Sequence, residues 1–257
     1  NPRWYLVIQF VSGLVGDKMR ELEKDRNVLE SIKSTVPQNI GKRLELEENE
    51  RIVDSICTRF QDWMPKSAEI EGNKNDLFVI KCVHEMQVIR VMKLLATSCG
   101  YERLFLRRVN IAPAESTALF QFLSYIENLR VLHIYGCTME RLATRELAKL
   151  LLKNGNCKLT ELKISFNVLL KCESGRCLSA RDSSKNKIGE LTSLNVSNNK
   201  ITDGSGRCSS DALESNNLKL TKLKMDGNKL TDESGRYLGD ALKNENCKLT
   251  KLDISNN

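Results

Sequence analysis

The sequence has few prolines, few histidines and no long apolar run. Its four prolines among 257 residues leave no proline-rich linker and no collagen-like tract. No apolar run reaches the roughly 18 residues that a membrane-spanning helix needs. The two histidines, His84 and His133, have no catalytic motif around them, whereas a Ser-His-Asp or Cys-His site needs a histidine held beside a nucleophile. These absences favour a globular chain without histidine-based catalysis.

Close cysteine pairs and phosphate-binding loops are also missing. The nine cysteines are an odd number without CxxC spacing, which argues against a secreted disulfide scaffold and a zinc site. GLVGDK, at residues 13–18, has the wrong spacing for a Walker A loop. The string GSG, at residues 204–206, is only half of a dinucleotide fingerprint and fits a turn. We therefore expect no catalytic residue, no metal and no cofactor, and interpret the chain as non-enzymatic.

The net charge of +7 is unevenly distributed. Residues 1–100 hold 15 basic and 15 acidic side chains, and subtraction from the totals of 40 and 33 leaves 25 and 18 for residues 101–257. The excess favours an acidic partner for the second part, although a charge of this size also keeps proteins soluble.

The first part of the chain is predicted to be helical. Residues 4–15 are almost continuously apolar, and Ile52, Ile56, Phe60 and Trp63 are spaced like one helical face. Another helix, capped by residue 75 or 76, is expected to run to about residue 98. Helices without intervening strands predict an all-α module over residues 1–98.

The second part repeats a leucine-rich segment six times. Four copies read LTELKISFN, LTSLNVSNN, LTKLKMDGN and LTKLDISNN. With two weaker copies, the starts are residues 101, 129, 159, 191, 220 and 249, at spacings of 28, 30, 32, 29 and 29. This is the leucine-rich pattern LxxLxLxxNxL, in which each repeat forms one coil of a solenoid.

Each copy predicts a short strand followed by a turn. Leu162 and Ile164 are two residues apart, so both point inward, whereas Lys163 points outward. An asparagine at the turn can bond backbone groups of the next coil. Val109 and Cys137 replace it in the first two coils, which should be less regular. We expect this structural role for Asn167, Asn199, Asn228 and Asn257.

A helix is expected after each turn. In the fifth coil Thr231 or Asp232 can cap it. Repeats of this length are similar to the ribonuclease-inhibitor class of leucine-rich repeats and predict an α/β solenoid, a short horseshoe arc, over residues 99–257. The third coil is the longest, and its helix should be weak or broken. The buried face of the fifth-coil helix is expected to contain Tyr237, Leu238, Ala241 and Leu242.

The repeats also account for several cysteines. Cys99, Cys157 and Cys247 occupy a position that the fifth coil fills with Leu218, so this position should be buried and apolar. Cys177 and Cys208 share a helix position with a tyrosine. We expect core packing, no disulfide, and shielding of Cys157 and Cys247 from solvent.

The outward-pointing strand residues are the candidates for binding. The small polar residues of the last three coils fit a solvated surface, whereas the aromatic residues of the first two coils, beside an arginine, have the composition of a binding hot spot. The alternative is that the helical module covers these first coils. The expected concave face contains Phe105, Arg107, His133, Tyr135, Lys163, Ser165, Asn195, Ser197, Lys224, Asp226, Asp253 and Ser255.

Several strings together resemble one receptor family. In NDLFVIKCVHEMQVIRVMKLL, Cys82, Glu85 and Gln87 match an LxxCxxExQ-like string. The segment resembles the helix that closes the nucleotide-binding module of NACHT–leucine-rich-repeat (NOD-like) receptors. FVSGLVGD, at residues 10–17, resembles the FxxGLL-type helix of that module's second helical domain. CKLTKLDISNN and LTDESGRYLGDALKN are similar to the repeats of the same family.

The resemblance implies the C-terminal fragment of a cytosolic innate-immune receptor. Its repeats would bind a protein or a microbial or danger-associated ligand on the concave face, or hold the nucleotide-binding module inactive. ATP hydrolysis would belong to that module, which this sequence lacks. The start without Met or a signal-peptide cleavage site, and the end at Asn257 within a coil, are interpreted as cuts in a longer chain. No membrane partner is expected.

The sequence also supports two alternative functions for the repeats and one prediction about the junction between the two parts of the chain. The repeats could form a ribonuclease-inhibitor-like binder, or bind nucleic acid through their basic residues. At the junction, Val79, Val83, Met86 and Leu95 are expected to pack the last helix of the module onto the first coil, whose apolar end needs a cover.

Overall fold

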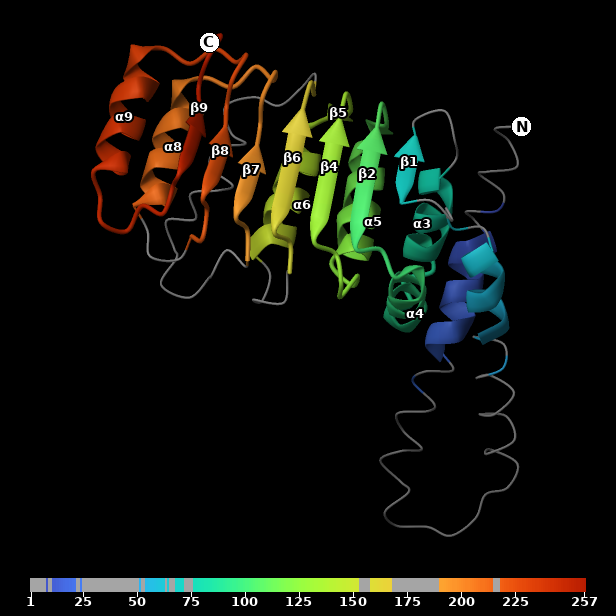
Figure 1. Ribbon diagram of the computed structural model, residues 1–257. Coiled ribbons are helices and arrows are strands. Elements are labelled where there is room, and N and C mark those ends of the chain that lie inside the picture. The colour runs from blue at the N-terminus through green and yellow to red at the C-terminus, as the bar shows by residue number, and fades with distance from the viewer. Residues whose placement is uncertain are drawn as a thin grey trace. The chain divides into compact units, whose positions relative to one another are not determined.

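The computed structural model (Figure 1) describes residues 8, 11–21, 24, 51, 54–62, 64, 68–71, 76–152, 158–167, 190–214 and 218–257. The chain forms two compact units. One consists of Asn1–Lys66 and Asn75–Cys99, and the other of Ser67–Lys74 and Gly100–Asn257. The second unit contains all the leucine-rich coils and carries the candidate site.

The second unit is built on a parallel sheet with one strand from each coil. Its strands lie in chain order, and each pairs in parallel with the next. The central leucines of all six coils are in register, for example Leu132 with Leu162. The predicted strand positions and the parallel pairing are confirmed. The six strands are β2 (Arg103–Arg107), β4 (Val131–Tyr135), β6 (Glu161–Ser165), β7 (Ser193–Asn195), β8 (Lys222–Lys224) and β9 (Lys251–Asp253).

A seventh strand, β1 (Glu69–Glu71), precedes the first coil. The prediction of helices alone up to residue 98 is wrong here, because β1 pairs in parallel with β2 and places Ile70 opposite Leu106. Ile70 is 2% exposed. Three residues are too few to show an alternating pattern, and the strand depends on backbone bonds to a distant segment, such as Phe105 N to Ala68 O at 2.8 Å. β1 therefore covers the edge of the first coil's strand.

Helices follow the strands and lie along one face of the sheet (Figure 1). They are α5 (Pro113–Leu123), α6 (Arg141–Leu152), α8 (Asp203–Leu213) and α9 (Asp232–Leu242). The short strands β3 (Asn110–Ile111) and β5 (Thr138–Met139) pair with each other. The predicted weak helix of the third coil falls within residues 168–189, outside the described residues. We call the opposite side of the sheet, which these helices leave open, the strand face.

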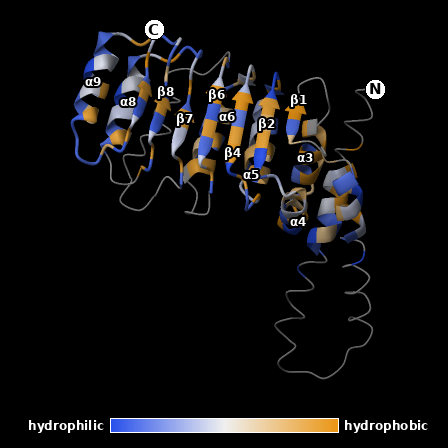
Figure 2. Cartoon of the chain, in the orientation of Figure 1, coloured by the Kyte–Doolittle hydropathy of each residue, from blue (hydrophilic) through white to orange (hydrophobic). Residues whose placement is uncertain are grey.

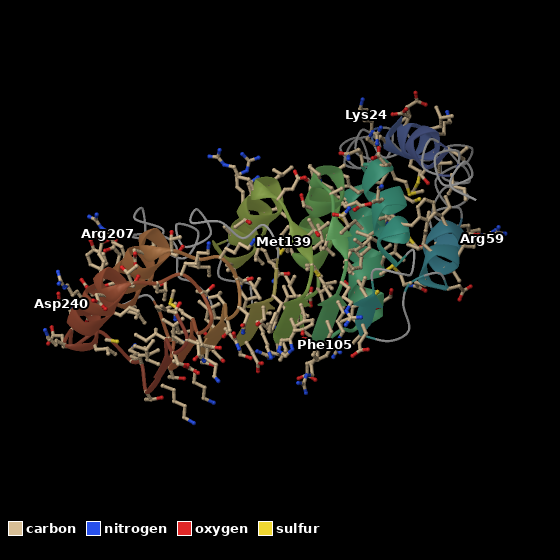
Figure 3. All side chains as sticks on the ribbon, turned by 90° about the horizontal axis from the view of Figure 1, so that it is seen from above. Lys24, Arg59, Phe105, Met139, Arg207 and Asp240 are labelled. Carbon is tan, nitrogen blue, oxygen red and sulfur yellow. The ribbon has the colours of Figure 1, made fainter. Side chains whose placement is uncertain are left out.

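Alternation along the strands fills the core with aliphatic side chains. Leu104, Leu106, Leu132 and Ile134 are each at most 1% exposed, and each contributes about 1.5–3 kcal/mol by burial. Hydrophobic and hydrophilic residues alternate along the strands in Figure 2, and Figure 3 shows Met139 between the strands and the helices. The core therefore lies between the sheet and its helices.

Helix α9 shows where the predicted buried stripe is correct and where it fails. Thr231 is its N-cap and accepts a bond from Glu233 N (3.3 Å). Leu238 and Ala241 are buried, as predicted, but Leu242 is 46% exposed. Leu242 lies about 40° around the helix from Leu238 and about 100° from Ala241, so it is at the border of the buried stripe. Tyr237, also predicted on this stripe, is only partly buried.

The turn asparagines link successive coils. Asn199 Oδ1 accepts from the backbone N of Asn167 (2.9 Å), and Asn199 Nδ2 donates to the carbonyls of Ile164 and Val196 (both 2.7 Å). Asn228 Oδ1 in turn accepts from Asn199 N (3.0 Å). The predicted bonds to the next coil are wrong, because these side chains bond the preceding one. The reason is that the free N–H of each turn points toward the C-terminal neighbour.

Threonines form a second ladder at the other end of the strands. The hydroxyl of Thr192 donates to Thr160 O, and that of Thr221 to Thr192 O, both at 3.1 Å. Thr250 continues the series with a 3.0 Å bond to Thr221 O. The threonine in each LT string therefore satisfies a carbonyl of the coil before it.

The first unit contains two helices where the sequence predicts one. α3 (Asp76–Glu85) and α4 (Ile89–Cys99) are separated at Gln87, which has φ +54°. The backbone N and the side-chain Nε2 of Gln87 both donate to His84 O, at 3.0 and 2.7 Å. A left-handed residue ends a helix by turning the chain off its axis, and no glycine or proline marks this position. Helical residues 11–21 and 54–62 belong to the same unit.

Candidate interaction site on the strand face

The side chains of the strand face form rows that run across the strands. The register places Glu69, Phe105, His133 and Lys163 next to one another in the central row. Figure 3 shows Phe105 on the side of the strands that points away from the helices. The row continues through Asn195, Lys224 and Asp253. The sequence-predicted candidates of this row therefore share one surface.

Phe105 is the centre of a cluster of cationic and aromatic groups. Its ring lies edge-on to the His133 ring, with centroids 4.9 Å apart and an interplanar angle of 87°. The guanidinium carbons of Arg103 and Arg107 each lie 5.8 Å from its centroid, within the range of a cation–π contact. Arg107 also pairs with Glu69 at 3.4 Å. These contacts position the cationic groups on the strand face.

A second aromatic pair extends this cluster toward the turns. Tyr135, at the end of β4, lies against Phe166, with ring centroids 5.2 Å apart and planes tilted by 54°. Tyr135 is 42% exposed and Phe166 is 50% exposed. Because both rings are half open to water while touching each other, together they present an apolar surface that a partner can cover.

Phe166 is the functional candidate that the sequence analysis misses. It lies in the turn after β6, with φ +61°, and the residue before the asparagine position is left-handed in every coil. The other residues at this position are Arg108, Gly136, Asn198, Gly227 and Asn256. Glycine and asparagine tolerate this conformation, whereas a bulky aromatic residue does not. The string SFN, among SNN and DGN, is the signal that could have revealed it.

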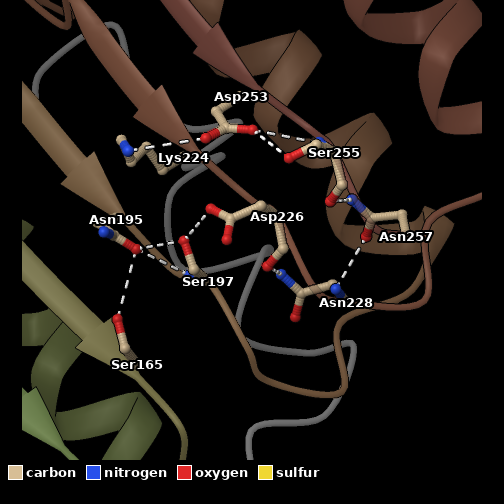
Figure 4. Close-up of polar contacts among 9 residues, drawn as sticks. All are labelled: Ser165, Asn195, Ser197, Lys224, Asp226, Asn228, Asp253, Ser255 and Asn257. Atoms are coloured by element: carbon tan, nitrogen blue, oxygen red, sulfur yellow. Dashed lines mark hydrogen bonds and ion pairs between the residues drawn. The ribbon is translucent and has the colours of Figure 1, made fainter.

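The last coils carry a polar network (Figure 4). The hydroxyl of Ser197 lies between two acceptors, Asn195 Oδ1 (2.6 Å) and the carboxylate of Asp226, and can donate to either. Ser165 Oγ donates to the same Asn195 oxygen (3.4 Å). Ser165 and Ser197 are 2% and 5% exposed. Ser165 and Ser197, both predicted contact residues, are therefore buried, because the network holds them between the strands.

Asp253 anchors the same network at the last strand. It accepts bonds from Ser255 Oγ (2.7 Å) and Ser255 N (3.2 Å) and lies 3.6 Å from Lys224 Nζ. The bonds from Ser255, followed by the charge of Lys224, hold the pKa of Asp253 below its usual value. Asp253 is therefore ionised and already partnered at neutral pH.

A shallow hollow of about 680 Å³ lies on the strand face between β6 and β9. The charged residues that line it are four lysines and two acidic residues, namely Lys163, Lys222, Lys224, Lys251, Glu161 and Asp253. Glu161 is engaged by His133 at 2.8 Å. In the described part of the chain, Lys163, Lys222 and Lys251 form no ion pair, so the hollow presents an excess of free positive charge.

The cysteines among the described residues do not lie on this face. Cys57, Cys82 and Cys137 are buried, and burial raises the pKa of the Cys137 thiol, which donates to Leu106 O (3.6 Å). Cys99, Cys208 and Cys247 are half-buried. The predicted shielding of Cys247 is therefore wrong, because it lies in the open turn after α9. The predictions for Cys157 and Cys177 fall outside the described residues.

Two features are absent from the described residues. No group of three or more His, Cys, Asp or Glu side chains is placed to hold a metal ion. Of the helices described, none combines the length and the apolar character that crossing a bilayer requires.

The comparisons with known proteins identify the repeats. A family model described as Leucine Rich repeat matches residues 191–208 and 216–239. No curated protein matches the chain. A crystal structure of an internalin (inlF) from Listeria monocytogenes is similar at 17% identity and a TM-score of 0.40. The alignment covers 66% of this chain and 45% of the internalin chain, so this chain spans less than half of that protein's length.

Proposed function

For this chain of leucine-rich repeats, we propose a non-catalytic role in binding another protein through the strand face. The observation that carries the proposal is the exposed aromatic and arginine cluster of the first three coils. Aromatic residues and arginine are the types that dominate binding energy at protein interfaces. Tyr135 and Phe166 remain 42% and 50% exposed, although burial of aromatic side chains generally stabilises a fold.

Leucine-rich repeats as a class serve protein–protein interaction, and the matching family model indicates no catalytic activity. The rigid ladders of asparagine and threonine support this role. They fix the spacing of successive strands, so the side chains of the strand face are held in place before a partner arrives. Such preorganisation lowers the entropy cost of binding.

We propose further that the repeats belong to a cytosolic receptor of the NACHT–leucine-rich-repeat type. The support is the residue match at Cys82, Glu85 and Gln87 and the string FVSGLVGD at residues 10–17. The repeats would then sense a ligand or restrain a nucleotide-binding module encoded upstream. A reading frame upstream with a strand followed by GxxxxGKS or GxxxxGKT supports this assignment. An upstream frame made only of further repeats contradicts it.

The protein-binding role is tested by comparing what the chain captures when either face is altered. The strand-face variant is Arg107→Glu/Tyr135→Ala, and the helix-face control is Arg236→Glu, which changes the charge by the same amount. Each is immobilised and exposed to the same cell extract, and bound proteins are quantified by mass spectrometry. We expect a set of proteins that the strand-face variant loses and the control retains. Equal capture by all three chains would contradict the proposal.

A further inference from the structure

We infer that the strand face binds an extended acidic protein segment that carries one apolar anchor residue. The anchor would cover the Tyr135–Phe166 pair, and the acidic side chains would enter the lysine-lined hollow. The inference rests on the proposed protein-binding function and adds the chemistry of the partner.

The anchor position follows from an unfavourable backbone conformation. Phe166 holds φ +61° at a position that four other coils fill with glycine or asparagine. A residue in this region costs stability and persists where function requires it. Phe166 is also 50% exposed, so its ring repays little of that cost by burial. An aromatic residue that is both strained and exposed fits a binding role better than a packing role.

The charge of the partner follows from the hollow. Lys163, Lys222 and Lys251 have no ion-pair partner among the described residues, whereas Glu161 is held by His133 and Asp253 by Lys224. Carboxylates of a partner therefore meet free ammonium groups, and electrostatic complementarity of this kind selects partners by charge.

The anchor surface and the hollow are continuous, because both begin at β6. Phe166 directly follows that strand, and Lys163 lies within it. β8 is two strands further and β9 three, which corresponds to about 10 and 14 Å at the usual strand spacing of ~4.8 Å. Lys222 and Lys251 share the row of Glu161, five residues back along the strand from Phe166, which adds about 16 Å at ~3.3 Å per residue. The direct separations are therefore about 19 and 21 Å, so the anchor residue and the acidic residues of an extended peptide should lie about six positions apart.

The alternating charges favour a protein segment over a nucleic acid. Along the central row Lys163, Asn195, Lys224 and Asp253 follow one another, and Glu161 and Asp226 lie beside them. A phosphate backbone carries regularly spaced negative charges and would meet these carboxylates. A peptide can place neutral residues opposite them.

The test is a selection of random 12-residue peptides on the complete chain, displayed on phage. Selected peptides are then synthesised, and their affinities are measured by fluorescence anisotropy. We expect enrichment of an aromatic or aliphatic residue with Asp or Glu about six positions away. Binding should also weaken as salt rises from 50 to 300 mM, because part of it is electrostatic.

Three variants separate the two parts of the surface. Phe166→Asn should weaken peptide binding about 30-fold, the effect typical of losing a hot-spot residue. Lys222→Gln/Lys251→Gln should weaken it about 5- to 30-fold, as expected for losing two charge contacts. Arg207→Gln/Arg236→Gln removes the same charge from the helix face and should change nothing. Circular dichroism melting of each variant confirms that the fold is retained.

Four outcomes would overturn the inference: no enriched peptide, enriched peptides without acidic residues, affinities unchanged by both strand-face variants, or tighter binding of a 20-nucleotide single strand that competes with the peptides. The last outcome would assign the face to nucleic acid instead. Proteins captured through the strand face that do not compete with the peptides would refute the acidic segment while leaving the protein-binding role intact.

Discussion

Replacement of Phe166 by asparagine or alanine measures what this residue costs the fold. The left-handed conformation costs about 1–2 kcal/mol for an ordinary residue, and asparagine, which stands here in two other coils, relieves most of it. Loss of the ring contact with Tyr135 costs about 0.5–1.5 kcal/mol. For Phe166→Asn the two terms nearly cancel, so stability should stay within about 1 kcal/mol of the unaltered chain. Phe166→Ala loses the contact without relief and should be about 1 kcal/mol less stable than Phe166→Asn.

Urea denaturation of the complete chain measures this difference, and the variants are compared where they share the same m value, the slope of the unfolding free energy against urea concentration. Gly136→Ala provides the matched control, because Gly136 has φ +63° and its added Cβ would meet only Arg108 Cγ at 3.6 Å. It should therefore destabilise by the backbone term alone, about 1 kcal/mol. If Phe166→Asn destabilised the chain by more than about 2 kcal/mol, and as much as Phe166→Ala, Phe166 would be a packing residue and the argument for a functional anchor would fail.

Four further predictions concern the framework. Asn199→Ala should lower the free energy of unfolding in urea titrations by about 3–5 kcal/mol, because it leaves buried backbone groups without hydrogen-bond partners. The same change at the exposed Asn257 should lower it by about 1 kcal/mol, and equal losses at the two positions would refute the role of the ladder. Gly206→Ala brings the added Cβ against Ser234 Oγ and should lower the stability by about 1–3 kcal/mol, whereas Gly239→Ala, with nothing within 4 Å of its Cβ, should raise it by up to about 1 kcal/mol. Bonds from Ser234 and Thr231 lower the pKa of Asp203, so its carboxylate stabilises the fold fully above the usual Asp pKa and loses this effect as pH falls through the lowered pKa. Asp203→Asn should therefore reduce the loss of stability at acid pH, and an unchanged dependence of stability on pH would contradict this. A fragment of residues 100–257 lacks β1 and should aggregate on gel filtration; a monomer that melts no earlier than the whole chain would rule out a covering role for the N-terminal segments.

The repeat unit was predictable because its signal is both local and periodic. A leucine followed two residues later by another apolar residue defines each strand, and six copies fix the register, so β2, β4, β6, β7, β8 and β9 lie where this pattern predicts. β1 has only Ile70 between two glutamates and becomes a strand through β2, which no local pattern encodes. The break between α3 and α4 was missed for a similar reason. Gln87 is not a residue type that signals a helix end, yet it adopts φ +54° there.

The candidate site was predictable only where it lies on strands. Alternation placed Phe105, His133 and Tyr135 on one face, and the contact between Phe105 and His133 follows from the register. Phe166 lies in a turn, where alternation gives no direction, and its role depends on a left-handed conformation common to all coils. The burial of Ser165 was missed because it depends on the neighbouring Asn195 side chain.

Site-specific photocrosslinking tests the central claim most directly. A photoreactive phenylalanine analogue is introduced at Phe166 on the strand face, or at Arg236 on the helix face as control, in otherwise unaltered chains. Each chain is irradiated with the proteins that it captures, and the adducts are analysed by mass spectrometry. The account predicts adducts from position 166 to an acidic segment of a partner protein, and none from position 236. Capture of the same partner with adducts only from position 236 would contradict it.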